Sequence, residues 1–228
     1  MDQDELFAAT VDRINQRSPL TEVAVDSELA RPSAFIKLVE AEHLNWSSDD
    51  FRKVFGMRFR VKVPPLDQLN IITYPAPNKD VPIFIFFCML TKRKIIAHVN
   101  VYCAFDDEMY QSQYIKPLTN ILNTYESFAT KDRNPEWMQN YANDCTIYGL
   151  YPRERYEDIQ NIALQYAEHY MTQVAAAPVT TDPDRLQRLA EFQAGFVDDI
   201  RTKDKAQGMI AKMLGKEKTR RIFYEVTT

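Results

Sequence analysis

The chain has 228 residues, of which 45% are hydrophobic and 26% are charged, and its formal net charge is −4. This length and composition allow one globular domain with a large core, and the negative charge argues against general nucleic-acid binding. With five glycines, the sequence contains neither of the glycine-rich loops that cradle nucleotide phosphates. It has no apolar run of the ~20 residues that a membrane helix needs and no signal-peptide pattern. We therefore expect a single domain over residues 1–228 that is cytoplasmic, monomeric and not attached to a membrane.

The three cysteines, Cys88, Cys103 and Cys145, lie in apolar stretches. An odd number of buried cysteines is typical of free thiols in a reducing cytosol. No cluster of His, Cys, Asp and Glu has the spacing of metal ligands, so we expect no bound metal.

The N-terminal quarter predicts short helices and one strand. Apolar residues at helical spacing indicate a helix over residues 2–17, followed by an irregular stretch over 20–32. A helical pattern covers 34–44, and Ser47 begins a short helix that ends at Phe55. The alternation of Met57–Val63 predicts a strand with one polar face.

The central stretch predicts three strands in succession, because runs rich in Ile, Val, Phe and Tyr are separated by turn residues. These runs are Leu69–Tyr74, Pro82–Leu90 and Lys94–Tyr102. Their connections are too short for a crossover helix, so neighbouring strands are expected to be antiparallel. The middle run is apolar on both faces and should be covered on both sides.

The C-terminal half is mostly helical in pattern. An apolar stripe runs from Tyr110 to Tyr125, with a kink or break expected at Pro117. A helical turn, a strand and three further helices follow, over 135–141, 145–150, 153–175, 182–200 and 204–214, with Gly215 as a cap. This order predicts an α+β fold, a three-layer α/β/α sandwich around a mostly antiparallel sheet.

Three segments together are similar to one known family. Asn70–Phe84 resembles the strand–turn–strand segment of ferredoxin-dependent bilin reductases, and Lys203–Val226 resembles that family's C-terminal helix pair. Cys145–Pro152, with the helix after it, resembles a third segment in the same order and spacing. The resemblance runs from about residue 57 to the end. It implies an α/β/α sandwich that binds a linear tetrapyrrole between the sheet and the C-terminal helices.

The resemblance also implies the chemistry. Members reduce the tetrapyrrole by single-electron transfers from ferredoxin through radicals, with protein acids supplying protons, and they hold no metal or flavin. Asn70 matches an asparagine of phycoerythrobilin-synthase-like members, where others have a catalytic histidine. Asp204 matches a C-terminal aspartate that donates a proton in several members, and Lys205 matches a basic residue that can meet a propionate. The family's central aspartate, which protonates the bilin in most members, is replaced here by Phe87, an apolar residue of the expected pocket wall.

The third strand of the central stretch carries two further candidates. Alternation places Ile96, His98, Asn100 and Tyr102 on one face. Polar side chains on an inner face need partners, so His98 is either a satisfied core histidine or a pocket residue that replaces the missing acid. An imidazole with its ordinary pKa of ~6.5 suits proton transfer near neutrality. Asp204 likewise has a structural alternative, as a helix cap.

The segment from Arg201 to Arg221 holds eight basic and two acidic residues, a net +6 in a chain of −4. It is either a solvated helix face or a surface that captures substrate carboxylates or docks an acidic protein such as ferredoxin. For ferredoxin docking we name Lys212, Lys216, Lys218 and Arg220.

The sequence therefore leads to a first hypothesis and two alternatives. The first is ferredoxin-dependent reduction of a biliverdin-like tetrapyrrole, with Asp204, His98 and Asn70 catalytic and Phe87, Asn100 and Lys205 contacting the substrate. Electrons come from ferredoxin, and no cofactor is bound. The alternatives are a bilin-binding protein without activity, which the loss of the central acid favours, and a reductase of a different substrate on the same fold.

Overall fold

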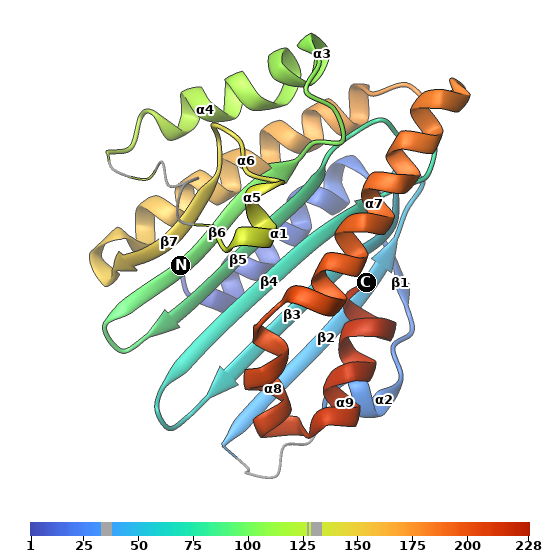
Figure 1. The fold of residues 1–228 in the computed structure, drawn as a ribbon. Coiled ribbons are helices and arrows are strands. Elements are labelled where there is room, and N and C mark those ends of the chain that lie inside the picture. Colours follow the sequence, from blue (N-terminus) through green and yellow to red (C-terminus); the bar gives the residue numbers. More distant parts are fainter. Residues whose placement is uncertain (33–37, 127, 129–133) are drawn as a thin grey trace.

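A computed structural model describes residues 1–32, 38–126, 128 and 134–228. The described residues form a seven-stranded antiparallel sheet in which each strand pairs with the next one along the chain (Figure 1). The strands are β1 (Thr21–Val23), β2 (Val39–Ser47), β3 (Phe51–Val61), β4 (Leu66–Pro75), β5 (Ile83–Thr91), β6 (Lys94–Tyr102) and β7 (Ile147–Pro152).

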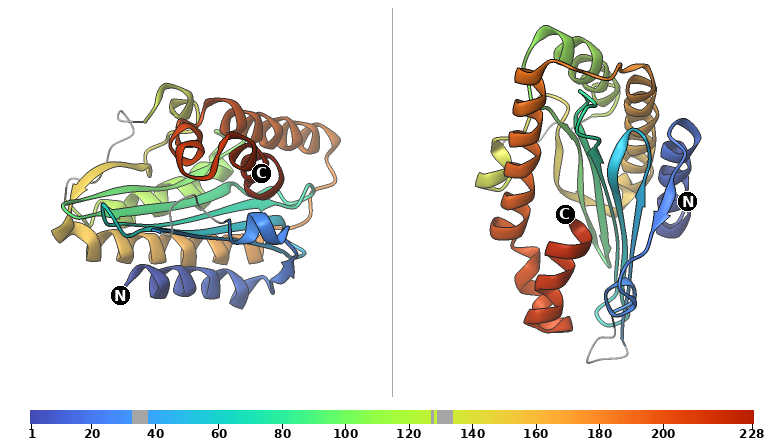
Figure 2. Two further views of the ribbon diagram at one scale, coloured as in Figure 1. Left: turned by 90° about the horizontal axis from the view of Figure 1, so that it is seen from below. Right: turned by 90° about the vertical axis from the view of Figure 1, so that its right-hand side faces the viewer.

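Helices cover both faces of the sheet, which confirms the expected three-layer sandwich (Figure 2). One face carries α1 (Gln3–Arg17) and α6 (Tyr156–Ala176). The other face carries α7 (Pro183–Lys203), α8 (Ala206–Leu214) and α9 (Lys216–Arg221). Shorter elements complete the fold: α2 (Ser27–Ala30), α3 (Glu108–Tyr110), the π-helix η1 (Gln111–Ile115), α4 (Lys116–Leu122), α5 (Glu136–Gln139), the 3-10 helix η3 (Arg153–Arg155) and the π-helix η4 (Ile222–Thr227).

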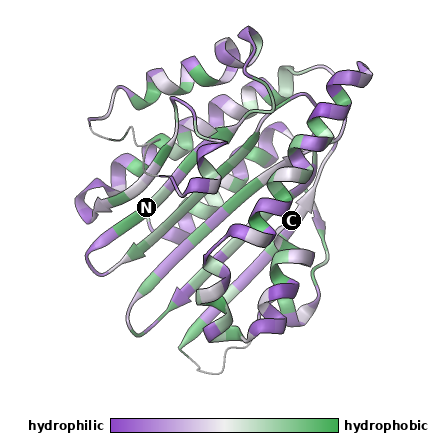
Figure 3. Cartoon of the chain, in the orientation of Figure 1, coloured by the Kyte–Doolittle hydropathy of each residue, from purple (hydrophilic) through white to green (hydrophobic). Residues whose placement is uncertain are grey.

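The alternation of side chains along the strands divides the core into two clusters. On β6, Ala97, Val99 and Val101 join the cluster beneath α1 and α6, whereas Tyr102 joins the cluster beneath α7 and α8. Hydrophobic residues concentrate in the central strands, and hydrophilic residues lie at the hairpin ends (Figure 3). Successive residues of a strand point to opposite faces, so each strand contributes to both cores.

The face beneath α6 carries a network of paired polar groups, although the buried hydroxyl of Tyr114 in the same cluster has no partner among the described residues. The Tyr170 hydroxyl donates to Pro82 O at 2.8 Å and lies 3.0 Å from Thr73 Oγ1. Thr73 Oγ1 in turn accepts the Phe84 N–H at 3.1 Å. Burying a polar group costs free energy unless the group is hydrogen-bonded. This network therefore allows Tyr170 and Thr73 to be buried in an apolar core.

The structure corrects the expected N-terminal elements. Residues 39–44, expected to be helical, belong to β2, and residues 34–37 of the same expected helix lie outside the described residues. Ser47–Phe55 is not a helix either, because Ser48 forms a tight turn with Phe51 from which β3 starts. Short apolar spacings fit either period, and pairing with β3 decides for the strand.

Two further expectations need revision. The stretch 20–32, expected to be irregular, contains β1 and α2. The helix does not end at Pro117, where a kink or break was expected: it changes from the wider turns of η1 to the α-helix α4, in which Pro117 is the second residue. The three strands of the central stretch are confirmed as β4, β5 and β6.

Gly56 on β3 is required by a close approach between layers. A Cβ at this position would lie 2.7 Å from Phe7 Cζ and 2.8 Å from a ring carbon of Trp46. We expect Gly56→Ala to lower the free energy of unfolding by about 1–3 kcal/mol, the usual cost of overpacking a core. The matched control is Gly195→Ala, because Gly195 lies in α7 with nothing within 4 Å of its Cβ position. That change should raise the free energy of unfolding by about 0.5–1 kcal/mol. Urea denaturation measures both, and equal effects of the two substitutions would contradict the packing argument.

Candidate functional site

A cavity of about 300 Å³ lies between the sheet and the helices α7 and α8. Its size is at the lower end of the range of small-molecule sites in proteins, and its lining is mostly apolar, as in such sites. The floor comes from β3 to β7 and the wall from α5, α7, α8 and η4. The lining residues used below are Gln68, Asn70, Phe87, His98, Tyr102, Trp137, Tyr148, Asp204, Lys205, Phe223 and Thr227.

Strand register brings three of the expected site residues into one row on the floor. Asn70 pairs with Phe87 across β4 and β5, and Phe87 pairs with His98 across β5 and β6. Met57 and Tyr148 extend this row on either side. Residues paired across strands point to the same face, so all five side chains face the cavity.

His98 is buried, with 3% of its surface exposed, and its Nε2 atom lies 3.0 Å from the Tyr102 hydroxyl. The ring of Tyr148 meets His98 edge-on, with 5.3 Å between centroids. Desolvation lowers the pKa of His98 to about 3. The imidazole is therefore neutral near pH 7, which contrasts with the ordinary pKa assumed from sequence for a proton-transfer role.

The two asparagines have different surroundings. Asn70 lines the cavity, and its Oδ1 is a buried atom that accepts no hydrogen bond from a described residue. Asn100 does not line the cavity: its amide donates to Tyr141 O at 3.2 Å, and its Oδ1 accepts the Val101 N–H. The structure therefore gives Asn100 a structural role instead of the expected substrate contact, while Asn70 keeps an acceptor free for a ligand.

Asp204 stands at the junction of α7 and α8, and it is the one carboxylic acid among the described residues that line the cavity. It is the C-cap of α7, and its Oδ1 accepts the Ala206 N–H at 2.8 Å. Burial raises the pKa of Asp204, while the Ala206 N–H opposes the rise. Asp204 thus combines both roles considered from sequence, a cap and a cavity acid. Lys205, beside it, is exposed at the cavity rim.

The η4 wall is fastened by a lysine of the sheet. Lys53 Nζ donates to Val226 O at 3.1 Å and to Thr228 O at 2.9 Å. Burial, with Arg52 and Arg201 nearby, lowers the pKa of Lys53 to about 8. These bonds hold Phe223 and Thr227 against the cavity.

The four residues named for docking lie on α8 and α9. Lys212, Lys216 and Arg220 are exposed, and Lys218 is half-buried. Arg220 is paired with Glu217 at 2.9 Å, an exposed contact that leaves its charge accessible. The four residues therefore share one end of the helical layer that covers the cavity (Figure 1).

Sequence reasoning did not assign site roles to several lining residues. Gln68 precedes Asn70 by two positions on β4 and lies on the same face, but the strand predicted from sequence began only at Leu69. Tyr148 follows from its pairing with His98, once β7 is placed beside β6. Trp137 and Phe223 come from segments distant in the chain, and no local signal in the sequence indicated them.

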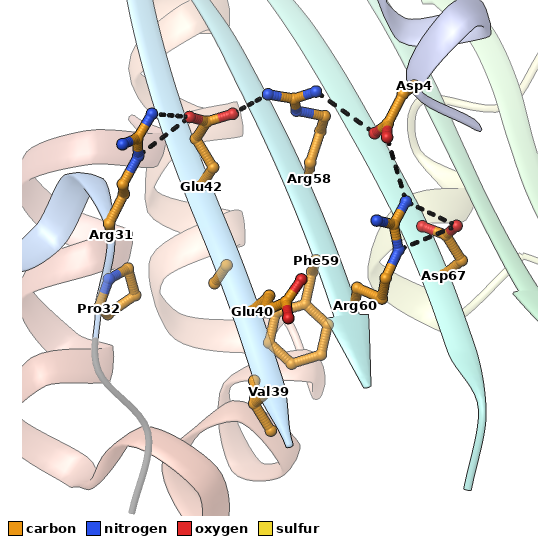
Figure 4. A pocket seen from close by; sticks show the side chains of 11 residues that line it. Asp4, Arg31, Pro32, Val39, Glu40, Glu42, Arg58, Phe59, Arg60 and Asp67 are labelled. Atoms are coloured by element: carbon orange, nitrogen blue, oxygen red, sulfur yellow. Dashed lines mark hydrogen bonds and ion pairs between the residues drawn. The ribbon is translucent and has the colours of Figure 1, made fainter. Parts of the chain in front are cut away.

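A second hollow lies near the N-terminus of α1 and is lined by ion pairs (Figure 4). Glu42 bridges Arg31 and Arg58, while Asp4 bridges Arg58 and Arg60. Since its arginines are neutralised by protein carboxylates, we assign this hollow no ligand.

Within the described part of the chain, no helix is long and apolar enough to cross a membrane.

The raised pKa of Asp204 predicts a pH dependence of stability. The folded protein binds the Asp204 proton more tightly than the unfolded chain does, so this group weakens stability as pH rises from 3.8 through its raised folded pKa. Asp204→Asn removes that loss and keeps an Oδ1 acceptor for Ala206. We expect the free energy of unfolding of the variant minus that of the wild type to increase across this window and then level off. Urea titrations at a series of pH values measure this difference, and one that is independent of pH would contradict the assignment.

Three comparisons with known proteins bear on the family and the fold of the chain. The model of the ferredoxin-dependent bilin reductase family matches residues 7–227. A 15,16-dihydrobiliverdin:ferredoxin oxidoreductase of Nostoc punctiforme is 28% identical over 162 residues, which are 68% of this chain and 65%, just under two thirds, of that protein. Phytochromobilin synthase from tomato, solved in complex with biliverdin, has the same fold, with a TM-score of 0.87, 13% identity and coverage of 98% of this chain and 82% of its own. The chain therefore belongs to the ferredoxin-dependent bilin reductase family.

Proposed function

We propose that this protein reduces a biliverdin-like linear tetrapyrrole in the cavity between the sheet and α7–α8, with electrons from ferredoxin. The observation that carries the proposal is the buried Asn70 Oδ1 facing an apolar cavity that holds one acid, Asp204. An orphaned acceptor is costly unless a ligand supplies a donor, and the pyrrole N–H groups of a bilin are such donors. Family membership supports both the substrate class and the electron source.

The proposed reaction adds two electrons and two protons to one double bond of the tetrapyrrole, through radical intermediates. Ferredoxin supplies the electrons one at a time. Each electron makes the tetrapyrrole more basic, so a proton source is needed within hydrogen-bond reach. Asp204, whose pKa is raised by burial, gives one proton and is reloaded from water, and water supplies the other.

The remaining residues bind and orient. Asn70 accepts a pyrrole N–H, and Phe87 forms the apolar floor between Asn70 and His98. Lys205 at the rim meets a propionate of the substrate, because an exposed ammonium can follow a carboxylate without desolvation. His98 contributes a neutral ring.

A second candidate is a protein that binds the tetrapyrrole without reducing it. The observation that favours it is the apolar row at the floor, where Phe87 stands between Asn70 and His98 and no described floor residue is an acid. Both candidates predict binding, and they differ in turnover.

Binding and turnover separate the candidates. Biliverdin added anaerobically to micromolar protein should show a shifted and sharpened long-wavelength band, and reduced ferredoxin should then bleach or shift it. Asp204→Asn should leave the dissociation constant nearly unchanged and cut the turnover rate about 10²-fold, the low end for a lost general acid. A bilin radical should accumulate and be seen by electron paramagnetic resonance.

Each outcome has a distinct meaning. An unchanged biliverdin spectrum in the wild type would refute both candidates. Turnover by Asp204→Asn at the wild-type rate would remove Asp204 as the donor. If the wild type binds biliverdin without reducing it, while Phe87→Asp reduces it, the protein is a binder in which the floor lacks the acid.

Docking of ferredoxin is expected at the basic end of α8 and α9. Replacing Lys216, Lys218 and Arg220 by Glu should slow reduction by ferredoxin about 10-fold or more at low ionic strength, with a smaller effect as salt rises. A small neutral reductant should be unaffected. The matched control changes Lys92, Arg93 and Lys94 to Glu, which alters the net charge equally at the exposed β5–β6 turn. Equal slowing by both triple variants would exclude a specific docking site.

A further inference from the structure

The hydrogen bond between His98 and Tyr102 can run in either direction, according to the tautomer of His98. Tyr102 is 1% exposed, and the one hydrogen bond of its hydroxyl to a described residue is the 3.0 Å contact with His98 Nε2. Leaving a buried phenolic O–H without an acceptor costs more than leaving a phenolic oxygen without a donor, which favours the hydroxyl as donor. In that direction, Nε2 is the unprotonated nitrogen of a neutral ring.

The other ring nitrogen then carries the hydrogen. Nδ1 of His98 bonds to no residue in the described part of the chain, and His98 lines the cavity. The other two histidines differ, because His43 Nδ1 is bonded to Leu29 O at 2.6 Å and His169 Nε2 to Gln113 O at 2.7 Å. In this tautomer the one N–H of His98, a residue that lines the cavity, has no partner among the described residues.

We propose that Tyr102 is a positioning residue that fixes His98 in the Nδ1–H tautomer, so that His98 donates a hydrogen bond to a carbonyl oxygen of the bound tetrapyrrole. This assignment rests on the proposed function for the identity of the ligand, but not for the tautomer. The sequence analysis placed Tyr102 on one face of its strand without giving it a role. The proposal gives it one, which is to hold the tautomer of His98. It also separates two roles on opposite sides of the cavity: His98 binds from the floor, and Asp204 supplies the proton from the helical wall.

Transfer of the Nδ1 proton of His98 to the ligand would be energetically unfavourable. If Nδ1 lost its proton to the ligand, Nε2 would have to take the Tyr102 proton and leave a buried phenolate. Burial raises the pKa of Tyr102 well above its ordinary value. The hydrogen therefore stays shared between the ring and the carbonyl, as a bond that orients the substrate.

The tautomer can be measured without any ligand. Long-range ¹H–¹⁵N correlation spectra of the ¹⁵N-labelled protein at pH 7 distinguish protonated from unprotonated ring nitrogens, and His98→Gln identifies the His98 signals among those of three histidines. We expect Nδ1 protonated and Nε2 unprotonated in the wild type. Tyr102→Phe keeps the ring, which packs against Phe196 with 5.1 Å between centroids, and removes the donor. It should convert the single tautomer into a mixture.

The matched control is Tyr148→Phe, which removes the hydroxyl of the other tyrosine whose ring contacts His98. Its His98 tautomer should remain that of the wild type. An Nε2–H tautomer in the wild-type protein, or an equal change in both variants, would overturn the assignment of Tyr102.

The ligand contact is tested with biliverdin. Tyr102→Phe should weaken binding about 3- to 10-fold, the effect of one neutral hydrogen bond. The lactam C=O stretching band of bound biliverdin should lie at a higher infrared frequency in the variant than in the wild type. An unchanged band would refute the carbonyl contact. If biliverdin does not bind at all, the proposed function and the carbonyl contact both fail, while the tautomer measured in the free protein decides the role of Tyr102 separately.

Discussion

The register of the antiparallel sheet is the constraint on which the rest of the structure depends. Because side chains alternate along a strand, a slip of one residue between β5 and β6 would turn His98 into the core beneath α6 and bring Ala97 or Val99 to the cavity. The apolar cluster beneath α1 and α6 opposes that slip strongly, since it would have to accept an imidazole in a dry, fully packed layer. The packed face beneath α1 and α6 therefore determines which side chains of the opposite face line the cavity.

This division also explains how a cavity can persist. Large apolar cavities destabilise a fold in proportion to the contacts that they forgo. Here one face of the sheet is filled by α1 and α6, including tyrosines whose hydroxyls are paired, such as Tyr170 and Tyr166. The other face is covered by the ends of α7 and α8, which meet the sheet through fewer contacts, and the η4 segment is held by the bonds from Lys53. The tighter packing therefore lies on one face of the sheet, and the cavity lies on the other.

The sequence allowed the central strands to be predicted because β4, β5 and β6 are long apolar runs with clear turns between them. The strand β2 was predicted wrongly, because its apolar and polar residues fit a helical period until β3 is placed beside it. Asn70, Phe87 and Asp204 could be identified as cavity residues through the family resemblance and alternation. The bond between His98 and Tyr102, and the use of Asn100 by the backbone of Tyr141, depend on distances that no spacing in the sequence encodes.

The position of the acid on the helical wall has its own physical consequence. Asp204 is the C-cap of α7, where the negative end of the helix dipole disfavours a carboxylate, and its burial acts in the same direction. Both effects raise the pKa of Asp204 and so favour its protonated form. When Asp204 has given up its proton, the Ala206 N–H at 2.8 Å stabilises the carboxylate. The junction of α7 and α8 therefore combines burial, which favours the protonated acid, with a backbone donor that stabilises the carboxylate.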